Sequence, residues 1–134
     1  NADPSTLNFN TSFNGTNYSD TAFIDSGSNG YFFNDSSIPT CSSSADFFCP
    51  TSMLNLSATT QGFTSGTGTV NFSVANADTL FTDFPNDAAF GDLAGPAGSQ
   101  AYFDWGLPFF YGRNVYTAIE GATAPGGTTP YWAY

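Results

Sequence analysis

A single carboxylate lies inside an apolar and aromatic stretch, FIDSGSNGYFF, at residues 23–33. Asp25 follows Phe23 and Ile24, and a turn of Ser, Gly and Asn residues separates it from Tyr31. A charge at the end of an apolar strand is costly unless neighbouring N–H and O–H groups bind it. An Asp in a Ser/Gly turn usually bonds to its own backbone. The alternative is a carboxylate held in place for acid–base chemistry, and these residues alone leave both interpretations open.

The charge balance of the chain excludes several classes of function. Its 134 residues include eleven carboxylates, one cation, Arg113, and no His, for a net charge of −10. One Arg cannot supply the phosphate contacts that nucleic acids or anionic membranes require, so neither is expected as a partner. The lack of His excludes Ser/His/Asp and Cys/His triads and most zinc sites, so no metal and no cofactor is expected. No apolar run reaches the roughly 20 residues of a membrane-spanning helix.

The composition is typical of proteins outside the cytoplasm, with few charged residues, no Lys and many Asn, Ser, Thr and Gly residues. The chain starts at Asn1 without a Met, which indicates a processed product or a fragment. Cys41 and Cys49 are close in the sequence and are expected to form a disulfide in such a setting, with two free thiols as the alternative. Together these features predict an extracellular or periplasmic protein.

Period-two alternation and turn residues recur along the chain, whereas helical periodicity is nearly absent, so an all-β domain is predicted. A first strand starts near Leu7, Asn14-Gly15 forms a hairpin turn, and the returning strand ends at Asp25. Later strands are expected at residues 31–33, 54–63, 69–74 and 115–119, the last of them buried.

The remaining segments are predicted to be less regular. Residues 75–100 are rich in turn residues and are expected to form loops with one or two short strands. The one helix expected covers about two turns at residues 107–113, with Pro108 in its first turn. The length fits one domain, residues 1–121, and we expect a flexible aromatic tail at residues 122–134.

Three features accompany the Asp25 turn along the chain. A hairpin, LNFNTSFNGTNYSDTAFIDSGS, leads into it, a Gly-rich hairpin tip follows at residues 64–68, and FDWGLPFFYGRNVYTAIEG lies near the C-terminus. In this order they resemble the landmarks of one lobe of the pepsin-like and retropepsin-like aspartic peptidases, over most of residues 7–120. The resemblance implies a single aspartic-peptidase-like lobe with one short helix.

A closer resemblance is to one bacterial group, the DUF3443 proteins. The stretches AFIDSGSNGYFF, FFCP, VNFSVANADTLF and DWGLPFFYGRNVYTAIEG are similar to the C-terminal portion of those proteins. In that group a larger N-terminal portion, with its own Asp-Thr-Gly, comes first. The resemblance therefore implies a missing N-terminal lobe as one possible partner.

The peptidase resemblance implies roles for the residues of the Asp25 turn. Asp25 would be the catalytic aspartate, and the Ser26 hydroxyl would brace two such turns against each other. The Gly27 amide and the Ser28 hydroxyl would bond to the carboxylate.

The resemblance also assigns two supporting segments. A flap over the substrate would be formed by Thr64, Ser65, Gly66, Thr67 and Gly68. Trp105 and Gly106 would thread behind the Asp25 turn in the psi-shaped core of the family. The sequence departs from the family in two ways, because the hairpin tip lacks a Tyr and Gly112 interrupts the expected helix.

Aspartic peptidases use two carboxylates that share one proton, one acting as base and the other as acid. This chain has one Asp-Ser-Gly turn. Asp104 precedes Trp-Gly but has no such turn, and Asp83, Asp87 and Asp92 lie in expected loops. The second carboxylate is therefore expected from another copy or from the missing lobe, and a lone lobe is expected to be inert.

Two functions follow as expectations. The first is a secreted, non-catalytic structural or self-assembling module, such as a fibre subunit, in which Tyr131, Trp132 and Tyr134 bury against another copy or a missing lobe. A tail packed on its own domain is the alternative for those aromatics. The second function is half of an aspartic endopeptidase that acts on peptides when a second lobe is present. A carbohydrate-binding β-domain is a third, supported by composition alone.

Overall fold

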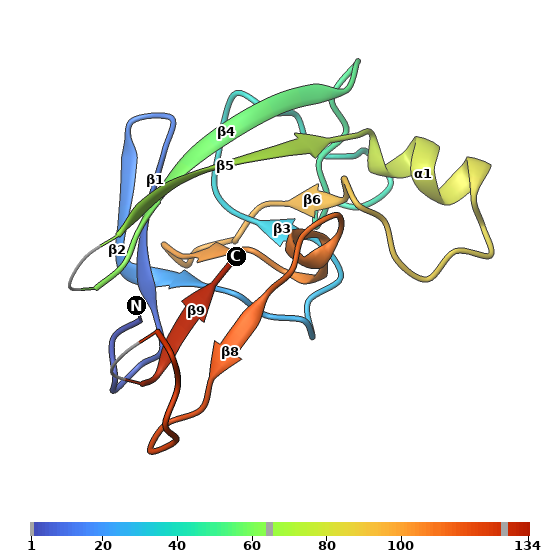
Figure 1. Cartoon of the computed structure of the whole chain (residues 1–134). Helices are drawn as coiled ribbons and strands as arrows, with labels where there is room; N and C mark the ends of the chain where they lie inside the picture. Colours follow the sequence, from blue (N-terminus) through green and yellow to red (C-terminus); the bar gives the residue numbers. More distant parts are fainter. Residues whose placement is uncertain (1, 64–65, 127–128) are drawn as a thin grey trace.

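The computed structural model describes residues 2–63, 66–126 and 129–134. The protein is mostly β, as predicted, and its main feature is a curved seven-stranded sheet (Figure 1). The strand order in that sheet is β5-β4-β1-β2-β7-β3-β6, and β8 and β9 form a separate two-stranded sheet. The strands are β1 (Phe9–Phe13), β2 (Thr16–Phe23), β3 (Tyr31–Phe32), β4 (Leu54–Gln61), β5 (Thr67–Val74), β6 (Ala94–Gly95), β7 (Phe103–Asp104), β8 (Tyr116–Ala118) and β9 (Tyr131–Ala133).

Two antiparallel hairpins form the longer strands. Asn14 and Gly15 adopt positive φ values of 50° and 82° in the turn between β1 and β2, which confirms the predicted hairpin turn. In the second hairpin, β4 and β5 pair without interruption from Leu54↔Val74 to Gln61↔Thr67. The first hairpin matters most for the site, because β2 leads directly into the Asp25 turn.

The core is built from aromatic side chains on the inner face of the large sheet. Phe13, Phe33, Phe103 and Trp105 are all buried there. The Phe33 and Phe103 rings are stacked with centroids 5.0 Å apart, and the Phe103 and Trp105 centroids are 4.5 Å apart. Such pairs add to the free energy gained from burying the rings. Phe33 and Phe103, which lie on the segments beside the Asp25 turn, therefore anchor those segments in the aromatic core.

The structure corrects three predictions about regular structure. The α-helix α1 (Ala77–Asp83) lies inside the segment that was predicted as loops and short strands. The predicted helix at residues 107–113 is instead a single 3-10 turn, η1 (Leu107–Phe110). The last strand of the predicted series is not buried, because Tyr116 and Ile119 are 62% and 72% exposed.

The C-terminal aromatics return to their own chain. β9 pairs with β8 in an antiparallel register that sets Thr117 opposite Trp132. The Trp132 Nε1 group donates to the Leu7 carbonyl oxygen at 3.3 Å, and the Tyr134 ring lies edge-on to Phe109 with centroids 4.8 Å apart. These contacts fit the alternative in which the tail packs on its own domain.

Within the part of the chain that the structure describes, no helix is both long and apolar enough to cross a membrane.

Candidate functional site

The candidate site lies where β2 and β7 end side by side. These strands run parallel, with Ala22 opposite Phe103 and Phe23 opposite Asp104. The Trp105 amide continues the pairing by donating to the Phe23 carbonyl at 2.9 Å. Neighbouring parallel strands have their C-terminal ends on the same side of a sheet, so the pairing brings Asp25 and Asp104 close together. The predicted adjacency of the Asp25 turn and Trp105-Gly106 is confirmed.

Gly106 passes close behind the turn. The neighbouring Leu107 amide donates to the Ser28 carbonyl at 2.7 Å. A Cβ atom on Gly106 would lie 1.9 Å from the Gly30 carbonyl oxygen, and its φ of 50° is in the region that favours glycine. Glycine at this position therefore lets the two segments touch backbone to backbone and fixes the position of the turn.

Asp25 is held by donors from its own turn. The Gly27 amide donates to Oδ1 at 2.7 Å, and the Ser28 hydroxyl donates to Oδ2 at 2.9 Å. Asp25 is half-buried, whereas Ser26 and Gly27 are exposed. The two bonds are those that the peptidase resemblance implies, and they are equally those of a structural Asx-type turn. The two bonds fix the direction of the carboxylate, and the residue stays partly exposed.

Asp104 is the second carboxylate of the site. It is only 4% exposed, and its Oδ1 accepts a hydrogen bond from the Gly106 amide at 2.8 Å. Burial raises the pKa of Asp104, and the charge of Asp25 raises it further, whereas the nearby Ser28 hydroxyl and the hydrogen bond from the Gly106 amide oppose the rise. The Ser28 hydroxyl therefore donates to the partly exposed Asp25 and lies near the buried Asp104.

Asp104 was not predicted as the second carboxylate, because it lacks a Ser/Gly turn of its own. It does not need one, because the parallel pairing with β2 places it beside the turn that belongs to Asp25. A signal was present in the sequence, since Asp104 lies between Phe103 and Trp105 and is, like Asp25, a charge in an apolar strand.

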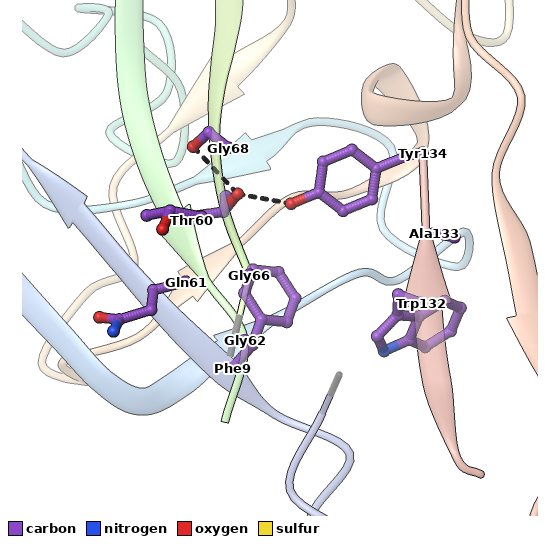
Figure 2. Close-up of a pocket in the computed structure, with 10 residues that line it drawn as sticks. Phe9, Thr60, Gln61, Gly62, Gly66, Gly68, Trp132, Ala133 and Tyr134 are labelled. Atoms are coloured by element: carbon purple, nitrogen blue, oxygen red, sulfur yellow. Dashed lines mark hydrogen bonds between the residues drawn. The ribbon is translucent and has the colours of Figure 1, made fainter. Parts of the chain in front are cut away.

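The predicted flap is described only in part, because Thr64 and Ser65 lie outside the described residues. Gly66, Thr67 and Gly68 line a pocket of about 250 Å³ that is closed on its other side by β9. Figure 2 shows Tyr134 reaching from the end of β9 toward Thr60, and the two hydroxyl oxygens are 2.5 Å apart. The end of the hairpin thus contacts the chain's own C-terminus.

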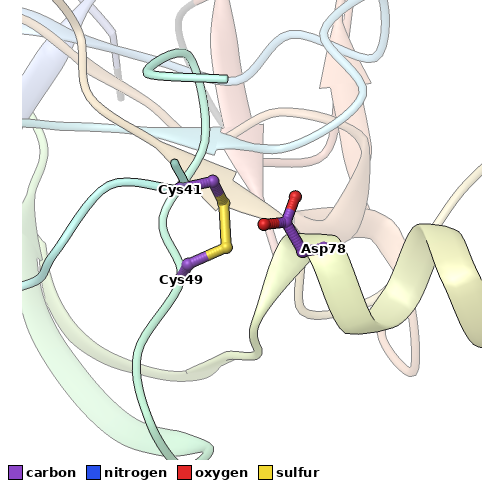
Figure 3. Close-up of side chains that lie close together, drawn as sticks. All are labelled: Cys41, Cys49 and Asp78. Atoms are coloured by element: carbon purple, nitrogen blue, oxygen red, sulfur yellow. A yellow bond between two sulfur atoms is a disulfide. The ribbon is translucent and has the colours of Figure 1, made fainter. Parts of the chain in front are cut away.

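Cys41 and Cys49 form a disulfide, as predicted. Figure 3 shows the Asp78 carboxylate beside the two sulfur atoms. Both thiolates are used up in the S–S bond, so this group does not offer the sulfur ligands that a zinc ion would take. The disulfide is also typical of proteins in oxidising compartments outside the cytoplasm.

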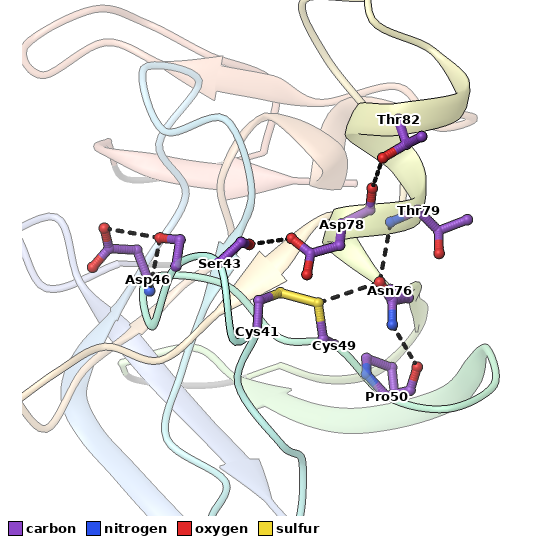
Figure 4. Close-up of a disulfide and its surroundings, with 10 residues drawn as sticks. Cys41, Ser43, Asp46, Cys49, Pro50, Asn76, Asp78, Thr79 and Thr82 are labelled. Atoms are coloured by element: carbon purple, nitrogen blue, oxygen red, sulfur yellow. Dashed lines mark hydrogen bonds between the residues drawn. A yellow bond between two sulfur atoms is a disulfide. The ribbon is translucent and has the colours of Figure 1, made fainter.

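The surroundings of the disulfide are structural (Figure 4). The Asn76 side chain caps α1 by accepting from the Thr79 amide at 3.1 Å, and its Nδ2 donates to the Pro50 carbonyl at 3.2 Å. The Ser43 hydroxyl donates to Asp78 in the first turn of the same helix. These bonds tie the disulfide loop to α1.

Comparison with known protein families gives a match over nearly the whole chain. A family model described as "Protein of unknown function (DUF3443)" matches residues 2–134. No curated protein and no solved structure matches the chain. None of these comparisons supports the resemblance to aspartic peptidases, which rests on the sequence motifs.

Proposed function

Because the chain belongs to the DUF3443 family, which brings no known activity with it, we propose a function from the site itself: an acid–base pair of carboxylates, of the kind that hydrolyses peptide bonds. Asp25 and Asp104 are the pair, and Ser28 positions Asp25. The observation that carries the proposal is that the parallel ends of β2 and β7 bring a partly exposed carboxylate, bonded by the Ser28 hydroxyl, close to a buried one.

The two environments suit two roles. Burial raises the pKa of Asp104, so this carboxyl keeps its proton to a higher pH than an ordinary Asp does. Asp25 is half-buried and can meet water. Carboxylates whose surroundings differ in this way are the pattern from which acid and base are assigned. Asp104 is accordingly the acid and Asp25 the base.

The proposed reaction balances without a cofactor. Asp25 takes a proton from a water molecule as the water oxygen bonds to the peptide carbonyl carbon, and Asp104 gives its proton to the carbonyl oxygen. The tetrahedral intermediate then breaks the C–N bond. Asp25 passes its proton to the departing amine, and the hydroxyl proton returns to Asp104. Both carboxyls end in their starting states.

The test is cleavage of an unstructured protein, such as reduced and alkylated casein, between pH 3 and pH 7. General acid–base groups contribute about 10²- to 10⁴-fold to a rate. We therefore expect Asp25→Asn and Asp104→Asn each to lower cleavage at least about 100-fold. Asp83→Asn, which changes an exposed carboxylate at the end of α1, serves as the matched control and should retain activity.

Two results would contradict this proposal. Cleavage that survives Asp104→Asn but not Asp25→Asn, with a rate that rises as the square of the protein concentration, would assign the second carboxylate to another copy. That is the half-peptidase predicted from the sequence. No cleavage by the unaltered chain at any concentration, alone or with the N-terminal portion of a DUF3443 protein, would leave the Asp25 turn as a structural feature.

The second candidate is the secreted structural or self-assembling module predicted from the sequence. One observation favours it: the β4–β5 hairpin carries no charged residue, although the chain as a whole carries −10. Contacts between copies through Tyr131, Trp132 and Tyr134 stay a prediction, although Trp132 and Tyr134 already have partners within the chain.

A further inference from the structure

The β5 strand forms one edge of the seven-stranded sheet. It pairs with β4 along its whole length, and among the described strands it has no neighbour on its other side. The opposite edge strand, β6, is only two residues long and both are buried. A long unpaired strand offers a row of N–H and C=O groups to which another strand can pair. The two edges of this sheet therefore differ in what they can bind.

β5 carries none of the features that usually protect an edge. Its sequence, TGTVNFSV, has no Lys, no Pro and no acidic residue, and its register with β4 shows no bulge. Val70 and Phe72 point into the core, whereas Thr69 and Asn71 are exposed, polar and uncharged. The strand is regular and pairs with β4 on one side (Figure 1). On its other side its start lines the pocket that β9 also lines, and the Ala75 amide just after its end donates to the Asp92 carbonyl, so the part without a paired neighbour is the stretch between them, around Asn71.

The distribution of charge indicates which partner this edge suits. Residues 47–77 contain no charged side chain, so all eleven carboxylates and Arg113 lie elsewhere in the chain. Two copies, each with a net charge of −10, repel each other over a Debye length of about 10 Å at 0.1 M salt. The repulsion is smallest where neither copy presents a carboxylate. A cationic partner would instead be attracted to the acidic parts of the surface.

We propose that β5 pairs with β5 of a second copy, antiparallel and about a two-fold axis, so that the two large sheets become continuous. A two-fold contact uses the same surface on both copies and satisfies both edges at once. The proposal rests on the self-association proposed above and not on the Asp25 site. A contact of two strands buries little surface, so a reversible dimer that depends on concentration is expected.

The test is sedimentation velocity of the whole chain over a range of concentrations at low salt. Asn71→Asp adds a carboxylate of nearly the same shape to the edge, and a two-fold contact brings the new charges of both copies near each other. We expect this change to weaken the dimer at least tenfold and high salt to restore part of the loss. Asn17→Asp is the matched control, because it adds the same charge to β2 and can still accept the hydrogen bond from Ser12.

A charge-swap experiment identifies the partner. Asn71→Lys mixed with Asn71→Asp should associate more tightly than Asn71→Asp alone, which only a contact between copies explains. Unchanged circular dichroism would show that each variant folds. The proposal is wrong if the unaltered chain stays a monomer at every concentration, or if Asn71→Asp has no effect. It is also wrong if Asp25→Asn abolishes association. The same holds if truncation after Gly121 abolishes association while Asn71→Asp still dimerises.

Discussion

Asp25 and Asp104 show how the same residue type acquires two characters within one site. Asp25 has its carboxylate oxygens bonded by the Gly27 amide and the Ser28 hydroxyl and is half-buried. Asp104 is almost completely buried and bonds to the Gly106 amide. A buried carboxyl favours its neutral form because the surroundings solvate a charge poorly. The difference between the two is therefore produced by position in the sheet and not by residue type.

At this scale the structure predicts how Asp104 affects stability. Burial raises its pKa in the folded state above the unfolded value. Its contribution to stability is then fully present below the unfolded pKa and is lost as pH rises through the folded pKa. Asp104→Asn should therefore raise the melting temperature at pH 7 and have little effect near pH 3. Each unit by which the folded-state pKa is raised corresponds to about 1.4 kcal/mol in the free energy of unfolding that is lost at neutral pH.

Asp35→Asn provides a control with the opposite sign. Burial pushes the pKa of Asp35 up, but hydrogen bonds from Ser37 and Asn14 outweigh burial and lower it. Stability from this group is present at neutral pH and is lost as pH falls through the lowered pKa. Asp35→Asn should thus destabilise at pH 7 and have little effect at low pH. Equal shifts of the melting temperature at pH 3 and pH 7 in both variants would contradict the raised pKa of Asp104.

At the scale of elements, the site depends on β7 lying between β2 and β3. β7 is parallel to β2 and antiparallel to β3, and the chain then turns away behind residues 25–30 at Gly106. Asp104 is the last residue of β7 and lies two residues before Gly106. The position of its carboxylate therefore depends on the close approach of Gly106 to Gly30. A change that pushes Gly106 away from Gly30 must also move Asp104.

Gly106→Ala should destabilise the protein strongly. The new methyl group would overlap the Gly30 carbonyl, and a non-glycine residue at this φ adds a backbone cost of about 1 to 2 kcal/mol. With overpacking at about 1 to 3 kcal/mol, we expect a total loss of about 2 to 5 kcal/mol in urea unfolding. Gly112→Ala is the control, because its φ of 74° is similar but nothing lies within 4 Å of the added Cβ. Equal losses in the two variants would show that the contact with Gly30 has no energetic importance.

At the scale of the whole molecule, the two ends of the chain pack together. Trp132 on β9 bonds to Leu7 near the N-terminus, and Tyr134 contacts both Thr60 and Phe109. The aromatic C-terminus thus covers part of the core that the large sheet alone would leave exposed. Arg113, the one cation of the chain, lies over the same Phe109 ring at 4.3 Å.

Truncation after Gly121 should therefore destabilise the protein. It removes β9 and exposes the surface that Trp132 and Tyr134 cover, and loss of one buried aromatic side chain costs about 3 to 5 kcal/mol. Since these side chains are only partly buried, we expect a loss of about 2 to 4 kcal/mol in the free energy of unfolding. Urea titration of the truncated and full chains measures it. An unchanged midpoint, with weaker association only, would support the tail as an interface between copies.

Local signals allowed much of this fold to be predicted from the sequence. Alternation marked β5, with Val70, Phe72 and Val74 all buried, and Asn14-Gly15 marked the first hairpin because it tolerates positive φ. The short separation of Cys41 and Cys49 predicted their disulfide. Each of these depends on residues that are near one another in the chain, so the sequence alone determined them.

Other features were decided by the tertiary structure. α1 has seven residues and buries only Ala77, so it leaves no helical period to detect, and the cap from Asn76 fixes where it starts. The pairing of Phe23 with Asp104 joins strands far apart in the sequence, and nothing local to either strand specifies it. That pairing places a second carboxylate beside Ser28. The sequence determined that Asp25 stands in a tight polar turn, and only the packing of β2 against β7 decided that a second carboxylate lies near it.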